Sequence, residues 1–199
     1  MILGITGSIA SGKSLVVRMF EESGAAIVSA DQIARDIVTP DSEVLRLLVE
    51  HFGQVIIRED GSLDRDRLGR IVFDDGNARA ELNRITHPAI AQLALERLRS
   101  LAQSGAPLVV YEAPLLFEAK AESRVDRVLV VTVDPETQLQ RLMSRDSLSL
   151  AEAKQRINAQ MTQEEKLARS DYVIDNSGTI EATREQVQQL WDRLVNGAR

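Results

Sequence analysis

A short loop framed by glycines near the start of the chain constrains the fold more than any other feature of the sequence. Residues 7–14 read Gly-Ser-Ile-Ala-Ser-Gly-Lys-Ser and match the pattern G-x-x-x-x-G-K-[ST]. The apolar run at residues 2–5 predicts a buried strand before this loop, and the apolar spacing over residues 14–20 predicts a helix after it. A plain strand–turn–helix corner is the alternative, but such a corner has no use for a Lys-Ser pair on its first helical turn.

The same loop has the chemistry of an anion site. Glycines let the backbone wrap around an anion with its N–H groups pointing inward, and the start of a helix adds a partial positive charge. Lys13 can reach the outer phosphates of a nucleoside triphosphate, and the Ser14 hydroxyl can ligate Mg²⁺. The sequence therefore predicts a triphosphate site, without indicating what the phosphate is used for.

Apolar runs recur along the chain, and they are continuous rather than alternating. This is the pattern of parallel strands whose two faces are both covered by helices, and helical patterns lie between the runs. We therefore expect an α/β fold of the P-loop NTPase type, with a five-stranded parallel sheet. The expected strands are residues 2–6, 25–29, 107–112, 127–133 and 171–175.

A helical insertion is expected at residues 41–105, between the second and third strands. This segment has three helical patterns and almost no strand signal. Thr86-His87-Pro88 is expected to separate the last two helices, with Pro88 at a first helical position and Thr86 or His87 near the cap.

A second helical segment is expected at residues 135–170. Asp134 precedes a proline and is expected to cap the first helix, while Ser149 with Glu152 and Thr162 with Glu165 fit capping boxes. This segment is either a solvated helical hairpin or a mobile lid, and its place after the fourth strand favours a lid. Its basic residues are Arg141, Arg145, Lys154, Arg156, Lys166 and Arg169. The predicted core is then residues 1–40, 106–134 and 171–199.

Charge and composition limit the partners. The net charge of −6 and a pI near 5.1 argue against general nucleic-acid binding. The chain has no cysteine, which excludes disulfides and thiolate metal sites, and no apolar stretch approaches a membrane span. We expect a cytoplasmic protein that is a monomer or a weak homo-oligomer and acts on small phosphorylated ligands.

Acidic residues after the strands are candidates for catalysis. Ligands bind beyond the carboxyl ends of the strands in an open parallel sheet, so Asp31 should face the same crevice as Lys13. Its carboxylate can accept a proton from a substrate hydroxyl or orient water on Mg²⁺, but a helix cap explains it equally well. Glu112 ends the third strand and could hold metal-bound water, and Glu118 is a candidate for a structural ion pair.

Other chemistries find little support. There is no G-x-S-x-G element for acyl transfer and no Asn-Lys-x-Asp element for reading guanine. His87 is best explained by capping or packing, and neither histidine has a partner at metal-ligand spacing. Trp191 fits the apolar period of the last helix and is expected in the core.

The chain resembles the dephospho-coenzyme A kinase family over nearly its whole length. The phosphate loop alone is shared by many families, whereas the remaining elements together are far more specific. They are Ala30-Asp31-Gln32-Ile33-Ala34-Arg35, Thr86-His87-Pro88, Pro114-Leu115-Leu116-Phe117-Glu118, Arg141 with Arg145-Asp146, Arg156-Ile157 with Gln160, and Asp171-Tyr172-Val173-Ile174-Asp175-Asn176-Ser177-Gly178.

The resemblance implies transfer of the ATP γ-phosphoryl group to the ribose 3′-hydroxyl of dephospho-coenzyme A, with Mg²⁺ as cofactor. It also implies three parts: a nucleotide-binding core, a helical domain that binds the acceptor and corresponds to residues 41–105, and a lid that corresponds to residues 135–170. It implies that Asp31 is the base, that Lys13 and Arg141 are catalytic, and that Ser14 binds the metal, with Asp31 or Glu112 acting on it through water. The implied ATP-binding residues are Gly7, Ala10, Ser11, Gly12, Lys13, Ser14, Arg141, Arg145 and, near the adenine, Asn176. The implied acceptor-binding residues are Thr6, Asp31, Arg35, His87, Pro114, Leu115 and Leu116.

Two departures from the family pattern are visible. Ser8 and Ala10 replace loop glycines, and Ala10 matters if its backbone needs a positive φ. Ser29 stands where the family often has an acidic residue, which puts a second ligand for Mg²⁺-bound water in doubt. Two rivals to the kinase function remain: a related kinase of nucleotides or another alcohol, and a regulatory module that only senses ATP.

Overall fold

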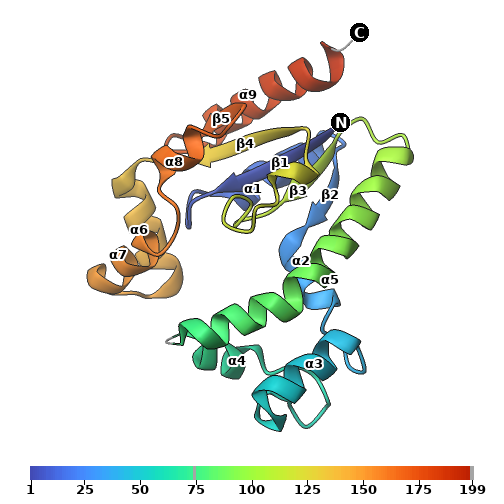
Figure 1. The fold of residues 1–199 in the computed structure, drawn as a ribbon. Helices are drawn as coiled ribbons and strands as arrows, with labels where there is room; N and C mark the ends of the chain where they lie inside the picture. Colours follow the sequence, from blue (N-terminus) through green and yellow to red (C-terminus); the bar gives the residue numbers. More distant parts are fainter. Residues whose placement is uncertain (74, 198–199) are drawn as a thin grey trace. The chain divides into compact units, whose positions relative to one another are not determined.

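The computed structural model describes residues 1–73 and 75–197, and it contains a five-stranded parallel sheet (Figure 1). The strand order is β2-β3-β1-β4-β5, and every neighbouring pair is parallel. The α/β fold and the five strands expected from the apolar runs are thus confirmed. The strands are β1 (Ile2–Gly7), β2 (Ala26–Ser29), β3 (Val109–Glu112), β4 (Arg127–Thr132) and β5 (Tyr172–Asp175).

Helices connect the strands, and several begin at the predicted caps. The Asp134 side chain accepts a hydrogen bond from the Thr137 N–H at the start of α6, with Pro135 as the first helical residue. Both predicted capping boxes, at Ser149 and Thr162, are present. The α-helices are α1 (Lys13–Glu22), α2 (Ala30–Asp36), α3 (Glu43–Phe52), α4 (Arg65–Phe73), α5 (Gly76–Gln103), α6 (Pro135–Asp146), α7 (Leu150–Asn158), α8 (Gln163–Leu167) and α9 (Ile180–Trp191). Short helical turns occur at Gln54–Ile56, Glu122–Arg124 and Asp192–Asn196.

The chain forms two compact units, and their boundary falls within α5. The first unit consists of Met1–Ser29 and Leu98–Arg199, and it contains the sheet. The second unit consists of Ala30–Arg97 and is helical. The assignment of parts of the chain to acceptor binding and to a lid stays a prediction.

The core of the first unit lies between the sheet and the helices α1 and α9. Strand residues such as Leu3 and Leu129 are fully buried and pack with Val16 and Phe20 of α1. Trp191 of α9 is 8% exposed, and its ring centroid lies 6.5 Å from that of Phe20. The prediction that Trp191 is a core residue is therefore confirmed.

Helix α5 corrects one prediction. It runs without a break from Gly76 to Gln103, so Pro88 lies inside it and neither Thr86 nor His87 caps a helix. An interior proline costs roughly 3 kcal/mol, because it removes one hydrogen bond and crowds the carbonyl four residues earlier. Burial of a large aliphatic side chain contributes about 1.5–3 kcal/mol, and both Ile85 and Leu98 of α5 are buried. Packing on either side of the proline thus outweighs its local cost.

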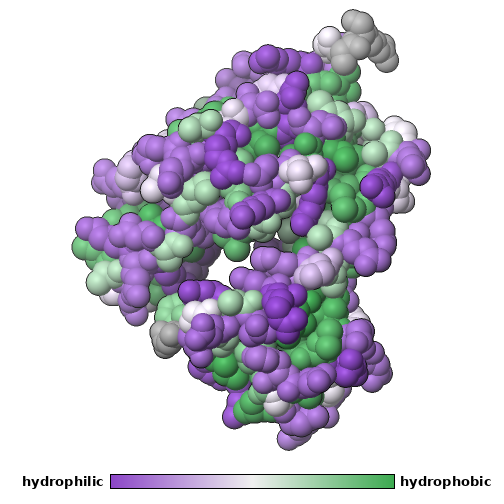
Figure 2. Space-filling model, in the orientation of Figure 1, coloured by the Kyte–Doolittle hydropathy of each residue, from purple (hydrophilic) through white to green (hydrophobic). Residues whose placement is uncertain are grey.

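The exposed surface matches the mixed composition of the chain. Hydrophilic residues cover most of the face shown in Figure 2, and the apolar residues lie between them. The large apolar side chains that remain exposed come from separate elements, as Val55, Phe73 and Ile180 illustrate. Within residues 1–73 and 75–197, no helix combines the length and the apolar character needed to cross a bilayer.

Candidate functional site

The predicted phosphate loop joins the end of β1 to the start of α1, and two of its residues are left-handed. Ala10 has φ 61° and Gly12 has φ 83°. Between them, the Ser11 N–H donates to the Ser8 carbonyl over 3.1 Å and closes a tight turn. A residue with a Cβ is strained in this region by roughly 1–2 kcal/mol, so the replacement of glycine by Ala10 carries a cost.

Backbone N–H groups of this loop are left for a ligand. Within the described part of the chain, the N–H groups of Ala10, Gly12, Lys13 and Ser14 donate to no protein acceptor. Unpaired N–H groups at the start of a helix, next to left-handed residues, form a concave site for an anion. The loop therefore has the donors that phosphate binding requires.

Asn176, which follows β5, holds the loop in place. Its Nδ2 donates to the Ser11 carbonyl over 2.8 Å, and its Oδ1 accepts from the Thr183 hydroxyl over 2.9 Å. A Cβ built on Gly12 would lie 1.9 Å from Asn176 Nδ2, so only glycine fits there. Whether Asn176 also lies near the adenine stays a prediction.

Lys13 forms an ion pair with a carboxylate at the end of β3, the strand next to β1. Its Nζ forms an ion pair with Oε1 of Glu112, and the two side chains are 11% and 17% exposed. Glu112 is the last residue of β3, where it is in register with Ile5 of β1 and Ser29 of β2. The ammonium group and this carboxylate thus lie together at the carboxyl edge of the sheet.

Arg141 of α6 brings a second cation to the loop. Its Nη1 lies 3.7 Å from the position that a Cβ on Gly12 would take. This atom is buried and has no hydrogen-bond partner in residues 1–73 or 75–197. A buried, unpaired guanidinium nitrogen is costly unless an anion binds it, so this corner favours a negatively charged ligand.

Arg145, one turn further along α6, has partners within the same segment. Its Nε donates to Oδ1 of Asp146 over 2.7 Å, and Arg156 of α7 donates to Oδ2 over 2.9 Å. The hydrogen bond from Arg145 holds the pKa of the Asp146 carboxyl below its usual range, and that of Arg145 is raised in return. Arg145 is 57% exposed at its side chain, so its environment differs from that of Arg141.

The turn after β3 is fixed from inside the fold. The buried Thr6 hydroxyl donates to the Pro114 carbonyl over 3.1 Å. Leu116 is fully buried, whereas Leu115 is 50% exposed. The predicted ion-pair role of Glu118 is confirmed, because its Oε1 lies 3.0 Å from Nζ of the buried Lys166 in α8.

Asp31 lies in the second unit, directly after β2. Helix α2 begins at Ala30, so Asp31 is within the first turn and does not precede the helix. The capping interpretation of Asp31 is therefore wrong, although a carboxylate in the first turn still favours the helix dipole. The side chain is exposed and forms no hydrogen bond or ion pair with the described residues.

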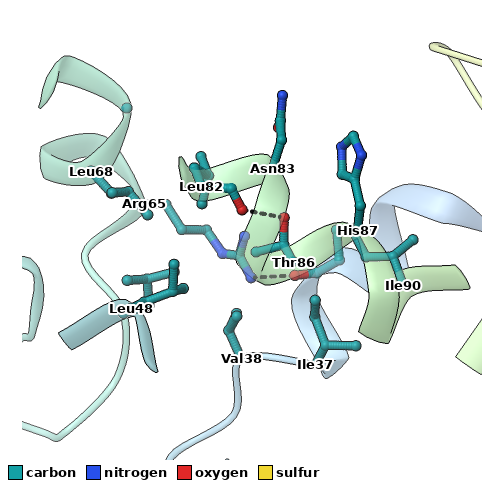
Figure 3. Close-up of a pocket in the computed structure, with 13 residues that line it drawn as sticks. Ile37, Val38, Leu48, Arg65, Leu68, Leu82, Asn83, Thr86, His87 and Ile90 are labelled. Carbon is teal, nitrogen blue, oxygen red and sulfur yellow. Dashed lines mark hydrogen bonds between the residues drawn. The ribbon is translucent and has the colours of Figure 1, made fainter. Parts of the chain in front are cut away.

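A mostly apolar cavity of about 280 Å³ opens in the second unit (Figure 3). Asn83 and His87 extend from α5 in the same direction, one turn apart. Arg65 of α4 reaches between the apolar residues and donates from Nη2 to the Ala34 carbonyl over 3.4 Å. The full lining is Ala34, Ile37, Val38, Leu48, Leu63, Arg65, Leu68, Gly69, Leu82, Asn83, Thr86, His87 and Ile90.

Two arginines face the same region of this unit. Burial lowers the pKa of the Arg65 guanidinium, and the nearby positive charge of Arg35 lowers it further. Two like charges close together are unfavourable unless an anion binds between or beside them. The region therefore suits a ligand that has both an apolar and an anionic part.

Sequence reasoning missed Arg65, Gln138 and Gln160 as site residues. Arg65 lies in a helix whose local pattern gave no sign of a pocket. Gln138 is 8% exposed and Gln160 half-buried, and both contact the backbone of Ile9 in the phosphate loop. Gln160 entered only within the family resemblance, and a buried glutamine has no sequence signature of its own.

Comparisons with known proteins agree on one family. The family model for dephospho-CoA kinase matches residues 1–182. The curated dephospho-CoA kinase of Syntrophotalea carbinolica is 54% identical over 197 residues, which cover 99% of this chain and 93% of that protein. The one of Geobacter sulfurreducens is 52% identical and covers 96% of each chain.

Solved structures give the same result. The dephospho-CoA kinase from Campylobacter jejuni aligns with a TM-score of 0.77 and 32% identity, over 100% of this chain and 98% of that one. TT1252 from Thermus thermophilus aligns with a TM-score of 0.82 and 34% identity, over 96% of this chain and 95% of that one. A shikimate kinase from Acinetobacter baumannii, at 15% identity and a TM-score of 0.56, shares the fold alone. With a phosphate loop, an adjacent Arg141 and these relatives along nearly all its length, the chain belongs to the dephospho-CoA kinase family.

Proposed function

We propose that Lys13, Asp31 and Arg141 are the catalytic residues of the reaction that the chain catalyses as a member of this family, the phosphorylation of dephospho-CoA with ATP. We also propose that the ribose 3′-hydroxyl is the group that accepts the phosphate. The observation that carries this proposal is the Nη1 of Arg141 beside Gly12 of the phosphate loop, because this atom is buried and has no hydrogen-bond partner in the described part of the chain. Phosphoryl transfer needs cations held where charge develops on the moving group. A guanidinium at that position serves transfer and is not needed for a purely structural corner.

On the donor side, the chain holds the triphosphate by its backbone and two cations. The free N–H groups of Ala10, Gly12 and Lys13 donate to phosphate oxygens, and Gly7 and Ser11 shape the loop. The Lys13 ammonium leaves Glu112 for the outer phosphates, which offer it more negative charge. Arg141 contacts the transferring group, while Arg145 and Asn176 complete the nucleotide site.

Magnesium fits the donor side. Mg²⁺ usually keeps several waters and takes one or two protein ligands together with substrate phosphates. The exposed Ser14 hydroxyl in the first turn of α1 fits this role, and the carboxylate of Glu112 or Asp31 can hold a metal-bound water. When bound, the ion neutralises charge on the phosphates during transfer.

On the acceptor side, Asp31 acts as the general base. Its carboxylate takes the proton of the 3′-hydroxyl as that oxygen bonds to the γ-phosphorus, and the bond from the γ-phosphorus to the bridging oxygen breaks to release ADP. The Asp31 side chain is exposed and has no ion-pair partner among residues 1–73 and 75–197, which supports this role, since an ion pair would weaken it as a base.

The rest of the acceptor is recognised through the second unit. Arg35 and Arg65 supply positive charge for the acceptor's diphosphate, and His87 lines the neighbouring cavity. The apolar walls suit the less polar arm of dephospho-CoA. From the other unit, Thr6 and the turn Pro114, Leu115 and Leu116 contribute by shaping the edge of the sheet.

The position of the new phosphate tests this function. Purified protein is incubated with ATP, Mg²⁺ and dephospho-CoA. The product is analysed by ³¹P NMR and by treatment with a 3′-nucleotidase, which removes only 3′-phosphates. Coenzyme A with a 3′-monophosphate is the expected product. A phosphate on the 2′-hydroxyl, or on the pantetheine alcohol, would contradict the assigned acceptor atom.

The rival functions are not favoured. A related kinase of another alcohol does not explain the match of the whole chain to one family, and an ATP sensor needs neither Asp31 nor Arg141 in place. We also infer that the enzyme is a cytoplasmic monomer or weak homo-oligomer that binds no nucleic acid. The net charge of −6 supports the absence of nucleic-acid binding, and the absence of cysteine supports the cytoplasm.

A further inference from the structure

Two glutamines of segment 135–170 contact the backbone of one residue of the phosphate loop, Ile9: one binds its carbonyl and the other its N–H. Gln138 of α6 donates from Nε2 to the Ile9 carbonyl over 2.8 Å. Gln160, after α7, accepts from the Ile9 N–H at its Oε1 over 2.9 Å. Both peptide groups of Ile9 are therefore held by side chains that lie more than a hundred residues away in sequence.

Because the peptide group is planar, these hydrogen bonds also set the direction in which the neighbouring N–H and C=O groups point. No described peptide bond is cis, and in a trans peptide the C=O and the N–H point in opposite directions. When Gln138 holds the Ile9 carbonyl, the Ala10 N–H of the same peptide must point away from α6. That N–H is one of the free donors of the phosphate loop.

Gln160 acts on the peptide before it. By holding the Ile9 N–H, it turns the Ser8 carbonyl to the opposite side, where that carbonyl accepts from the Ser11 N–H over 3.1 Å. This is the bond that closes the turn of the loop. The two glutamines thus fix both the turn and the direction of one phosphate donor.

The conformation that they fix is a strained one. Ala10 has φ 61°, which a residue with a Cβ rarely adopts unless its surroundings impose it. Hydrogen bonds on the Ile9 and Ser11 carbonyls, from Gln138 and Asn176, flank this residue and can impose it. Without them, Ala10 is free to relax and its N–H to turn away.

We propose that Gln138 and Gln160 are positioning residues for ATP, which shape the phosphate loop through the two peptide groups of Ile9. The proposal rests on the proposed function only in that this loop binds the triphosphate. It also links segment 135–170 directly to the loop, so that a displacement of this segment changes the affinity for phosphate.

Methionine variants test the proposal. Gln138→Met and Gln160→Met keep the length of each side chain and remove its amide. The matched controls are Gln140→Met on α6 and Gln155→Met on α7, both exposed. Among the described residues, the Gln140 amide donates to Glu136 alone. ATP affinity is measured by calorimetry, the KM values for ATP and dephospho-CoA and the kcat by steady-state kinetics, and the melting temperature by calorimetric scans.

Each Gln variant is expected to lose about three- to tenfold in ATP affinity, which is the net effect of one hydrogen bond. The KM for dephospho-CoA and the melting temperature stay close to wild type, and both controls behave as wild type. Because the two glutamines act on one residue, the fold-loss of ATP affinity in the double variant is smaller than the product of the fold-losses in the two single variants.

Three results would overturn the proposal: wild-type ATP affinity in both Gln variants, an equal loss in the controls, or an equal loss of dephospho-CoA affinity. If a methionine variant melts early, Gln138→Asn replaces it, since asparagine is polar but one methylene too short to reach Ile9. It must then show the same loss of ATP affinity. Wild-type protein that binds ATP without phosphorylating dephospho-CoA would contradict the proposed function and would leave this test intact.

Discussion

At the scale of single residues, Ala10 shows how an alanine can occupy a left-handed loop position, where glycine is the favoured residue. The position is left-handed, so the alanine is strained by roughly 1–2 kcal/mol. The hydrogen bonds on either side of it, from Gln138 and Asn176, hold the loop in this shape. The substitution is therefore tolerated because the surroundings over-determine the backbone.

Asp31 is expected to be essential for turnover but not for ATP binding. Asp31→Asn removes the base while keeping the size of the side chain, so kcat should fall by a factor on the order of 10² or more. The ATP affinity, measured by calorimetry, should stay within about twofold, because the loop that binds ATP is untouched. Full activity in this variant would reduce Asp31 to a residue of the first turn of α2.

Substitutions of Arg141 and Arg145 should have different effects on the kinetic constants. Arg141→Ala removes the guanidinium beside Gly12, and its kcat is expected to fall on the order of 10² through lost stabilisation of the transferring group. Arg145→Ala is the comparison on the same helix. Its guanidinium is engaged by Asp146 and is proposed to bind the nucleotide, so its KM for ATP should rise while its kcat changes much less. An Arg141 effect limited to the KM for ATP would contradict a role in the transfer step.

At the scale of elements, side-chain amides support the carboxyl edge of the sheet. Asn176 holds the phosphate loop, Gln163 accepts from the Val133 N–H over 3.2 Å, and Gln138 and Gln160 hold Ile9. An amide both donates and accepts, so it satisfies a backbone group without adding charge where phosphates bind. These contacts explain how short loops keep a fixed shape at this edge.

Asp146 should make the pairing of α6 with α7 sensitive to acid. Arg145 and Arg156 both donate to its carboxylate, and the pKa of Asp146 is lowered by these partners, with Arg145 the larger cause. A lowered pKa in the folded state means that the stabilisation is complete above the unfolded-state pKa, near 3.9, and is lost as the pH falls through the folded-state value.

Melting temperatures of wild type and Asp146→Asn measure this effect. The variant should melt below wild type at pH 7, and the difference should disappear as the pH falls well below 4. Glu185→Gln on α9, whose carboxylate forms no ion pair within residues 1–73 and 75–197, is the control. A difference that persists unchanged in acid would show that Asp146 acts through something other than its charge.

At the scale of the whole molecule, the sequence predicts the strands and the phosphate loop better than the long-range contacts between side chains and backbone. Buried parallel strands leave continuous apolar runs, and the phosphate loop has fixed spacing, so both were predictable. The break expected at Pro88 was wrong because burial on both sides of it outweighs a local rule. Gln138 and Asn176 were not predictable as supports, since their partners lie 129 and 165 residues away.

The second unit shows the same limit. Arg65 and the cavity beside His87 depend on how α2, α3, α4 and α5 pack, and no local pattern reports that packing. The sequence could name Arg35 and His87 only through the family resemblance. Their roles toward the acceptor stay predictions, whereas the family itself follows from the match of nearly the whole chain.

One measurement tests the central claim most directly: the rate of ADP release by purified protein with ATP and Mg²⁺, with and without dephospho-CoA. Nucleosides and pantetheine, each of which carries only part of the acceptor, serve as comparison substrates. We predict that dephospho-CoA stimulates ADP release, with one coenzyme A formed per ADP, and that the comparison substrates do so weakly or not at all. ADP release that dephospho-CoA leaves unchanged would contradict the account.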